Sequence, residues 1–414
     1  MLTVFPVARA RDEIVRSLQR WKVKTEKISL QNAPGRVTAG DIFAPEMLPP
    51  FPRSTVDGFA VRSADTFGAS EELPALLNLT GNILMGQEPP GPIAPGEAMS
   101  IPTGGMLPEG SDAVVMVEHG ELLGNSVAIF RPVAPLENAI QAGDDFKRGD
   151  LLLPAGQLIR PQDAGILAAM GLTGVEVTVP PQVVIISTGD EVVPPAQNPR
   201  SGQIRDINGF LLAAQVQQSG GRAVYTGIVA DCKETLRQAL WQALEEGEIV
   251  LVSGGSSVGT RDVAIAAINA LPGEGVLFHG VAMRPGKPLL YGMSNNKPVF
   301  GLSGNPVSAM FGFILFVKPA LRIMRGLTPF EPFTPTVTAV LQTNIASPGG
   351  REDYIRVALT TKWCVQDEDM VILAQPVFGG PGLLKTVVHG DGYFVVPRDV
   401  EGLPQGSTVK VFLW

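Results

Sequence analysis

The chain has 414 residues, of which 45% are hydrophobic and 17% charged, and its formal net charge is −8 at pH 7. A chain of this length forms about two to four domains, and the composition excludes intrinsic disorder. The acidic balance and the lack of any Lys/Arg run argue against nucleic acid as the main partner. Cys232 and Cys364 stand in no metal-binding spacing, which fits a reducing compartment. Neither a signal peptide nor a membrane-spanning apolar run is visible, so we expect a cytoplasmic protein.

The N-terminal region predicts one helix and one strand. Residues 6–21 carry apolar residues at helical spacing, and residues 22–30 are typical of a strand. Residues 161–171 predict a second helix, with Pro161 at its start and Gly171 beyond its end. We expect this helix to pack with the N-terminal helix and strand, so residues 1–45 and 146–180 form one predicted scaffold domain.

A small β domain is predicted over residues 46–145, where short strands are broken by Gly and Pro. Asp57 begins an Asp-Gly turn, and Thr103 precedes two glycines; taken singly, both residues fit an ordinary turn. Asp144 and Asp145 are adjacent in a glycine turn. They could bind Mg²⁺ or form a solvated turn, and the residues alone leave both interpretations open.

Strand and helix patterns alternate over residues 181–328, which predicts a doubly wound, mainly parallel α/β sheet. The buried strand at 249–252 ends in a Gly/Ser turn over 253–259, whose N–H and hydroxyl groups suit an anion such as a phosphate. A second strand leads to the basic loop 284–288, and a third ends at 303–306. Small-molecule sites form where such strands end.

Four acidic residues follow strand ends in this domain: Asp190, Glu191, Asp231 and Asp262. One such acid is ordinary helix capping, whereas four at one sheet edge indicate a polar site. After the proline-rich segment 327–335, the short strands of residues 329–414 predict a C-terminal β barrel or sandwich.

Six motifs together resemble the molybdopterin molybdenumtransferase family, which is similar to the C-terminal domain of gephyrin. They occur in the family's order at residues 56–60, 102–104, 187–191, 253–262, 284–288 and 301–308. The resemblance implies an elongated homodimer with four domains per subunit, including a C-terminal barrel. It also implies a Mg²⁺-dependent reaction in which adenylylated molybdopterin and molybdate yield the molybdenum cofactor and AMP.

The resemblance further implies roles for individual residues. The active-site cleft would contain Asp57, Thr103, Asp145, Glu191, Asp231 and Asp262, with Asp145, Glu191 and Asp262 as candidate Mg²⁺ ligands. Molybdopterin and molybdate would be bound by Ser253, Gly254, Gly255, Ser256, Ser257, Gly259, Arg284, Lys287, Ser303, Asn305, Ser308 and Arg356. Because Asp57, Thr103 and Asp145 belong to the small β domain, the cleft would be completed across the dimer interface.

Three features depart from the family pattern, and the last two of them favour a rival hypothesis. Arg284 stands where the family usually has Lys, residues 140–142 replace arginines common in bacterial relatives, and Gly/Pro residues at 379–382 replace a serine expected near molybdate. The rival is a carrier or scaffold that holds molybdopterin with little turnover. Possible protein partners are the adenylyltransferase upstream and molybdoenzymes downstream; no nucleic-acid or membrane partner is expected.

Overall fold

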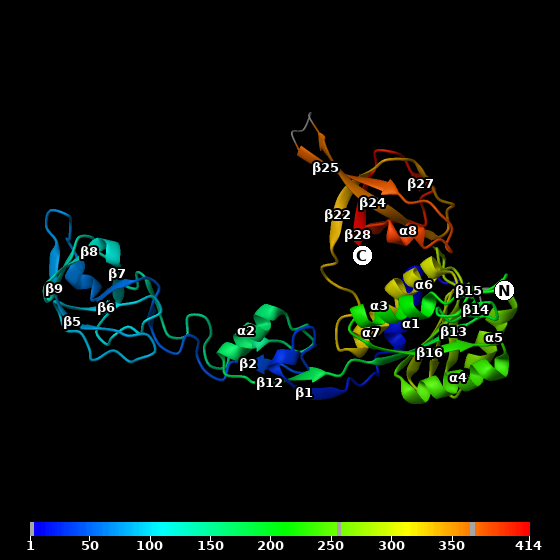
Figure 1. Cartoon of the computed structure of the whole chain (residues 1–414), viewed down its shortest axis with the longest axis horizontal. Coiled ribbons are helices and arrows are strands. Elements are labelled where there is room, and N and C mark those ends of the chain that lie inside the picture. The colour runs from blue at the N-terminus through cyan, green and yellow to red at the C-terminus, as the bar shows by residue number, and fades with distance from the viewer. Residues whose placement is uncertain (1–3, 255–257, 365–368) are drawn as a thin grey trace. The chain divides into compact units, whose positions relative to one another are not determined.

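The computed structural model describes residues 4–254, 258–364 and 369–414, with the backbone alone for residues 258–262, 364 and 369. The chain divides into two compact units, the first formed by Met1–Glu26, Gly35–Ala39 and Glu176–Trp414 and the second by Lys27–Pro34 and Gly40–Val175 (Figure 1). It passes between them four times: within β1 (Thr25–Ser29), between residues 34 and 35, between residues 39 and 40, and within β12 (Gly174–Thr178). The boundaries of the four predicted domains remain a prediction.

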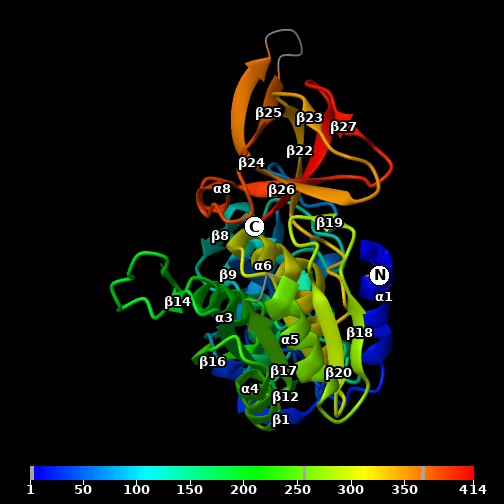
Figure 2. The same ribbon diagram turned by 90° about the vertical axis from the view of Figure 1, so that its right-hand side faces the viewer.

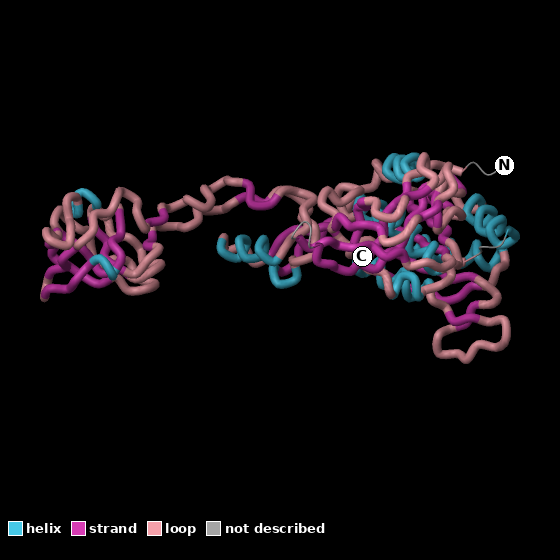
Figure 3. The backbone as a smooth tube through the Cα atoms, turned by 90° about the horizontal axis from the view of Figure 1, so that it is seen from above, coloured by secondary structure: helices cyan, strands magenta, loops and turns pink. Residues whose placement is uncertain are grey.

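The second unit is built mainly of strands and loops (Figure 3). Its six-stranded sheet has the order β7-β4-β6-β5-β9-β8, with β4 (Gly58–Val61), β5 (Ala75–Asn82), β6 (Glu97–Ile101), β7 (Ala113–Met116), β8 (Gly120–Leu123) and β9 (Ser126–Ile129). Phe59, Val115 and Val127 are buried in its core. Two short pairs, β2 (Ile42–Phe43) with β11 (Leu151–Leu153) and β3 (Arg53–Ser54) with β10 (Ala139–Ile140), flank the sheet in sequence.

Helix α2 (Pro161–Ala169) confirms the helix predicted in this unit. Asp163 accepts the Arg160 backbone N–H at 2.8 Å and closes a capping box, while Pro161 occupies the first turn, where a missing N–H costs nothing. The predicted N-terminal helix is α1 (Val7–Ser17), and its buried Val7, Ala10 and Ile14 belong to the core of the α/β sheet in the first unit.

The α/β sheet of the first unit is mainly parallel, as predicted. Its order is β16-β13-β17-β21-β20-β18, with β13 (Gln182–Thr188), β16 (Arg222–Val229), β17 (Ile249–Ser253), β18 (Gly275–His279), β20 (Leu290–Ser294) and β21 (Lys297–Leu302). Four neighbours, β16, β13, β17 and β21, run parallel. These strands are continuous apolar runs because helices cover both faces of the sheet.

The predicted alternation of strand and helix fails between β18 and β21. No helix separates β18 from β20, because only the loop that contains β19 (Met283–Arg284) lies between them; Figure 2 shows β18 and β20 side by side. Strand β20 pairs antiparallel with both β18 and β21. The two residues between β20 and β21, Asn295 and Asn296, have φ of 48° and 62°, the left-handed backbone of a tight hairpin. Since β18 and β21 are both antiparallel to β20, they run in the same direction, so the loops after β17, β18 and β21 still reach one edge of the sheet.

The helices separate into two layers. Leu212 of α3 (Asn208–Gln218) and Phe316 pack with α1 on one face, while Leu236 of α4 (Lys233–Glu246) and Ile268 of α5 (Val258–Asn269) pack on the other. The helical stretch Pro306–Met324, comprising α6 (Pro306–Gly312), η4 (Phe313–Val317) and α7 (Lys318–Met324), is long and apolar enough to cross a membrane, with a mean hydropathy of 1.6. It is 78% buried within the protein, as a core helix is.

The C-terminal strands form a closed barrel, which confirms one of the two predicted forms. The ring runs β24-β25-β22-β28-β26 and returns to β24, with β22 (Thr336–Leu341), β24 (Glu352–Cys364), β25 (Asp369–Pro376), β26 (Gly392–Val396) and β28 (Thr408–Leu413). A short helix, α8 (Lys385–Val388), precedes β26. Strand β19 (Met283–Arg284), from the basic loop after β18, pairs parallel with the start of β24. This pairing joins the predicted basic loop to the barrel.

Candidate functional site

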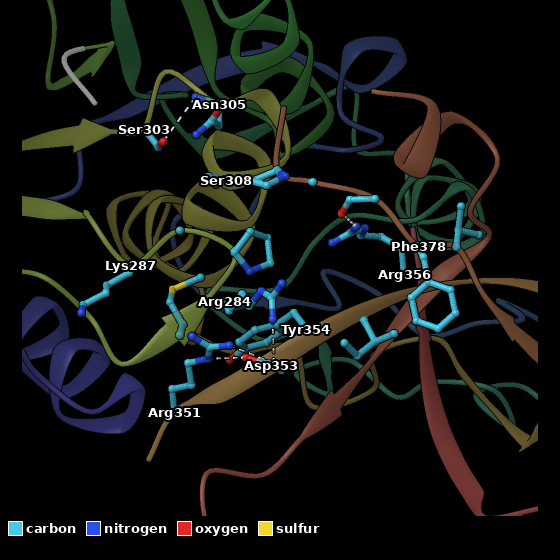
Figure 4. Close-up of a pocket in the computed structure, with 18 of the residues that line it drawn as sticks. Arg284, Lys287, Ser303, Asn305, Ser308, Arg351, Asp353, Tyr354, Arg356 and Phe378 are labelled. Carbon is cyan, nitrogen blue, oxygen red and sulfur yellow. Dashed lines mark hydrogen bonds and ion pairs between the residues drawn. The ribbon is translucent and has the colours of Figure 1, made fainter. Parts of the chain in front are cut away.

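A cavity of about 640 Å³ lies within the first unit, between the α/β sheet and the barrel (Figure 4). Three parts of the chain line it: the basic loop 283–288, residues 303–308 at the end of β21 and the start of α6, and barrel residues 345–381. The Val307 N–H donates to the Pro381 carbonyl at 3.1 Å, which fixes the start of α6 to the barrel. Six predicted binding residues meet here: Arg284, Lys287, Ser303, Asn305, Ser308 and Arg356.

The cavity is cationic. Four basic side chains line it, Arg284, Lys287, Arg351 and Arg356, against the single carboxylate of Asp353. A cavity walled by low-dielectric protein strengthens the field of such charges, so it attracts anions even in an acidic protein.

Arg356 is the most confined of these cations, with only 7% of its surface exposed. Its Nη2 donates to the Gly379 carbonyl at 3.0 Å, and its Nε has no hydrogen-bond partner among the described residues. Burial, and then the positive charge of Arg284, lower the pKa of Arg356. A buried guanidinium without a carboxylate is costly unless an anion completes its hydrogen bonds, so this residue indicates an anion site.

Sequence reasoning did not select Asp353, which the structure places on the cavity wall. Its carboxylate is 1% exposed, accepts Arg351 Nε at 2.8 Å and lies 3.9 Å from Arg284 Nη1. The only signal for it in the sequence was its place between Arg351 and Arg356 at the start of a predicted strand, and this spacing does not show which side chains lie together.

The turn after β17 is built for close backbone approach. Gly254 has φ of 140°, and a Cβ there would lie 2.0 Å from the Thr188 carbonyl oxygen. The Gly254 N–H donates to the Leu302 carbonyl at 3.3 Å, so the ends of β17 and β21 are held together. Of the rest of the predicted Gly/Ser loop, Gly255, Ser256 and Ser257 lie outside the described residues, and Gly259 is in the first turn of α5.

Asn208 is a second residue that the sequence reasoning missed. It is 7% exposed, and its Nδ2 donates to Ser253 Oγ at 2.7 Å and to the Gly304 carbonyl at 2.9 Å. One amide thus connects the first turn of α3 with the loops after β17 and β21. Nearby, Asp206 accepts the hydroxyls of Ser187 and Tyr225 at 2.7 and 2.6 Å. The polar residues before α3 were visible in the sequence, but their long-range partners were not.

Of the predicted acidic residues of this unit, Asp190 and Asp231 are hydrogen-bonded to each other, whereas Asp262 lies in a helix, α5. Asp231 accepts a hydrogen bond from Thr188 Oγ1, and its backbone N–H donates to Asp190 at 3.3 Å. Burial raises the pKa of Asp231, and the charges of Asp190 and Glu191 raise it further. Asp262 lies in α5, where the description covers the backbone alone. Among the described residues, no three His, Cys, Asp or Glu side chains form a group able to hold a metal.

Asp57, Thr103 and Asp145 lie in the second unit. Asp57 Oδ1 accepts the Thr103 N–H at 2.7 Å and the Thr103 hydroxyl at 3.0 Å, and these bonds lower the pKa of Asp57. Asp145 is exposed, while its neighbour Asp144 accepts the Gln141 N–H at 2.7 Å as a turn residue does. The assignment of all these residues to one cleft remains a prediction.

Comparisons with known proteins cover almost the whole chain. Residues 5–171 match the model of the MoeA N-terminal region (domain I and II), residues 184–323 match that of a probable molybdopterin binding domain, and residues 338–414 match the MoeA C-terminal region (domain IV). A putative molybdopterin biosynthesis protein of Methanocaldococcus jannaschii is 36% identical, with 94% of this chain and 92% of that protein covered. The molybdopterin molybdenumtransferase of Bacillus subtilis is 32% identical, with 97% and 93% covered.

Solved structures agree with the sequence relatives. The crystal structure of the molybdopterin biosynthesis MoeA protein from Pyrococcus horikoshii OT3 matches with a TM-score of 0.85 and 31% identity, over 100% of both chains. Because the relatives exceed 30% identity over nearly their full length and the three regional models follow one another in order, this chain belongs to the MoeA family.

Proposed function

We propose that this chain is a molybdopterin molybdenumtransferase that inserts molybdenum from molybdate into adenylylated molybdopterin and releases AMP. Its relatives carry that enzyme name at 32% identity over more than nine-tenths of both chains, and its family acts in molybdenum cofactor biosynthesis. The observation that carries the proposal is the cationic cavity, in which the Nε of the buried Arg356 has no partner within the described part of the chain.

The cavity suits the chemistry of the proposed substrates. Molybdate is a tetrahedral dianion, and guanidinium groups bind oxyanions through short, charge-assisted hydrogen bonds. The sulfurs of the pterin dithiolene are soft ligands and become the molybdenum ligands in the product. The protein therefore has to bind and orient two anionic substrates, while the substrate itself supplies the metal ligands.

The loops after β17 and β21 are proposed to hold the phosphate part of the pterin substrate. Gly254 permits close approach, and Asn208 keeps the two loops together through Ser253 and Gly304. Because residues 284–288 and 303–308 line one cavity, the proposed molybdate and pterin subsites would be adjacent. Proximity of this kind lowers the entropic part of a transfer barrier.

Mg²⁺ is part of the proposal. The crowding of Asp190 and Glu191 near Asp231, which raises the pKa of Asp231, is the charge environment that a divalent cation relieves. Asp145, Glu191 and Asp262 are the predicted ligands of the ion, and we add Asp231 as a further candidate because it lies beside Asp190 and Glu191. The ion would neutralise charge on the phosphoanhydride when AMP leaves.

A homodimer and a cytoplasmic location complete the proposal. Large apolar side chains of the second unit are exposed, including Phe43 (54%), Phe67 (64%) and Leu76 (65%), and a subunit interface would cover such side chains. Light scattering on the purified chain tests the dimer. A monomer at micromolar concentration would remove the part of the proposal in which Asp57 and Thr103 complete a partner's cleft.

The decisive experiment is a single-turnover assay with purified protein, adenylylated molybdopterin, molybdate and Mg²⁺. We expect AMP release that depends on molybdate, together with a product that reconstitutes an apo-molybdoenzyme. Omission of molybdate is the matched control. Binding of the pterin substrate without AMP release would exclude the transferase.

That outcome would leave the second candidate, a carrier that holds molybdopterin with little turnover. The observation that favours it is the cavity wall at Gly379, Gly380 and Pro381, which offers no side-chain hydroxyl to a bound oxyanion. Substitution of Gly380 by Ser is the direct test of this point, since nothing lies within 4 Å of a Cβ at that position.

A further inference from the structure

Asp353 is the one carboxylate among the residues that line the cationic cavity. It stands opposite Arg284 in the parallel register of β19 with β24, at the junction between the basic loop and the barrel. Only 1% of its surface is exposed. Figure 4 shows it between Arg284 and Arg351, on the wall that these three side chains share.

The two arginines are bound to Asp353 differently. Arg351 is fixed, because its Nε lies 2.8 Å from Oδ1 and its Nη2 lies 3.5 Å from Oδ2. Arg284 approaches Oδ2 only to 3.9 Å, and its side chain is 63% exposed. Arg284 is therefore the partner that can turn from the carboxylate to a ligand with little loss of interaction free energy.

A buried carboxylate beside an anion site has two opposing effects. It stabilises the arginines in the absence of a ligand, since unpaired guanidinium groups repel one another and lose solvation. It also repels an incoming anion and competes with that anion for the same N–H donors. Arg356 has no ion pair with Asp353, and its Nε has no partner in the residues that the structure describes, so Arg356 is available to the ligand.

We propose that Asp353 is an internal counter-ion that sets the oxyanion affinity of the cavity, by competing with the bound oxyanion for Arg284 and Arg351. This inference rests on the proposed function, in which the cavity takes molybdate. A dianion in the cavity draws Arg284 away from Asp353 and binds more weakly than it would beside a neutral side chain. The same competition speeds release of an oxyanion that has not reacted.

The test is the substitution Asp353→Asn, which keeps the shape and one acceptor for Arg351 but removes the charge. Molybdate titrated calorimetrically into the intact protein should bind at least about fivefold more tightly to the variant, as expected when a like charge close to the ligand is removed. Because Coulomb energy scales with ligand charge, the gain in log affinity should be about twice as large for sulfate as for the monoanion perchlorate.

The matched control is Asp399→Asn. Asp399 is in the same barrel, its side chain is 86% exposed, and it pairs with Arg398 at 3.4 Å, so this variant makes the same change in net charge outside the cavity. We expect its oxyanion affinity to remain within about twofold of the wild type. Thermal unfolding of each variant checks that the fold is retained.

Unchanged or weaker molybdate binding by a folded Asp353→Asn variant would overturn the inference and leave Asp353 with a purely structural role. An equal gain for monoanion and dianion would do the same. If the variant does not fold, Asp353→Glu, which retains the charge, should bind molybdate no more tightly than the wild type; tighter binding would contradict the proposal. These titrations measure binding alone. A failure of AMP release in the wild type would therefore refute the proposed function but would not alter the affinities expected here.

Discussion

Replacing Arg356 by methionine is the most informative perturbation of the cavity. Arg356 is 7% exposed, and among the described residues its side chain donates to the Gly379 carbonyl while its Nε has no partner. Hydrogen bonds to a charged group contribute about 1.5–3 kcal/mol each, and about 1.4 kcal/mol corresponds to a tenfold change in affinity. Loss of one such bond to molybdate should therefore weaken binding by roughly 10- to 150-fold.

The same change should not destabilise the fold. The guanidinium is buried without a carboxylate partner among the described residues, and burial lowers its pKa, so the folded protein bears the cost of holding this charge. Methionine fills a similar volume without the charge, at the expense of the bond to the Gly379 carbonyl. We expect a free energy of unfolding within about 1 kcal/mol of the wild type, or higher.

Calorimetric titration with molybdate and urea unfolding measure the two quantities. Arg398→Met is the control, because the Arg398 side chain is 52% exposed in the same barrel and lies outside the cavity lining. Unaltered molybdate affinity in Arg356→Met would refute the reasoning. A decrease of several kcal/mol in the free energy of unfolding would also refute it, because the guanidinium would then stabilise the fold.

Three further predictions concern the other polar clusters. Asp231→Asn should raise the midpoint of thermal unfolding at pH 7 by about 1–3 °C. Burial and neighbouring charges raise the pKa of Asp231, and a carboxyl group with a raised pKa destabilises the fold as pH rises through that pKa. In calorimetric scans, Mg²⁺ should raise the midpoint of the wild type but not of this variant. The Thr103 hydrogen bonds hold the pKa of Asp57 below 3.8, so they stabilise the turn fully above that pH and are lost as pH falls through the lowered pKa. Amide exchange at Thr103, followed by NMR, should quicken on that descent, and persistent protection would contradict the assignment. Asn208→Ala should lower the free energy of unfolding by about 1–3 kcal/mol in urea, since Ser253 and the Gly304 carbonyl lose their shared donor; no change would mean that water replaces the amide.

Much of the architecture was already readable in the sequence, because the signals for it are local. Apolar runs such as residues 182–186 and 249–252 became strands, and Pro161 with Gly171 delimited α2. The Gly/Ser and Arg/Lys turns appear at strand ends because only particular residue types tolerate those backbones. Six such turns in order also led to the family. The Asn-Asn hairpin at 295–296 carried the same kind of signal but was not recognised.

The tertiary structure decided which of these pieces share one cavity. The sequence placed Arg356 near a molybdate site by resemblance. It did not reveal that Nε is buried with no partner among the residues described, or that Asp353 faces Arg284 across a strand pairing. Nor did it connect Asn208 with Ser253 and Gly304, which lie 45 and 96 positions further along the chain. The physical reason is that periodicity and turn chemistry act over a few residues, whereas burial, strand register and the pairing of charges depend on segments that meet only after the chain has folded.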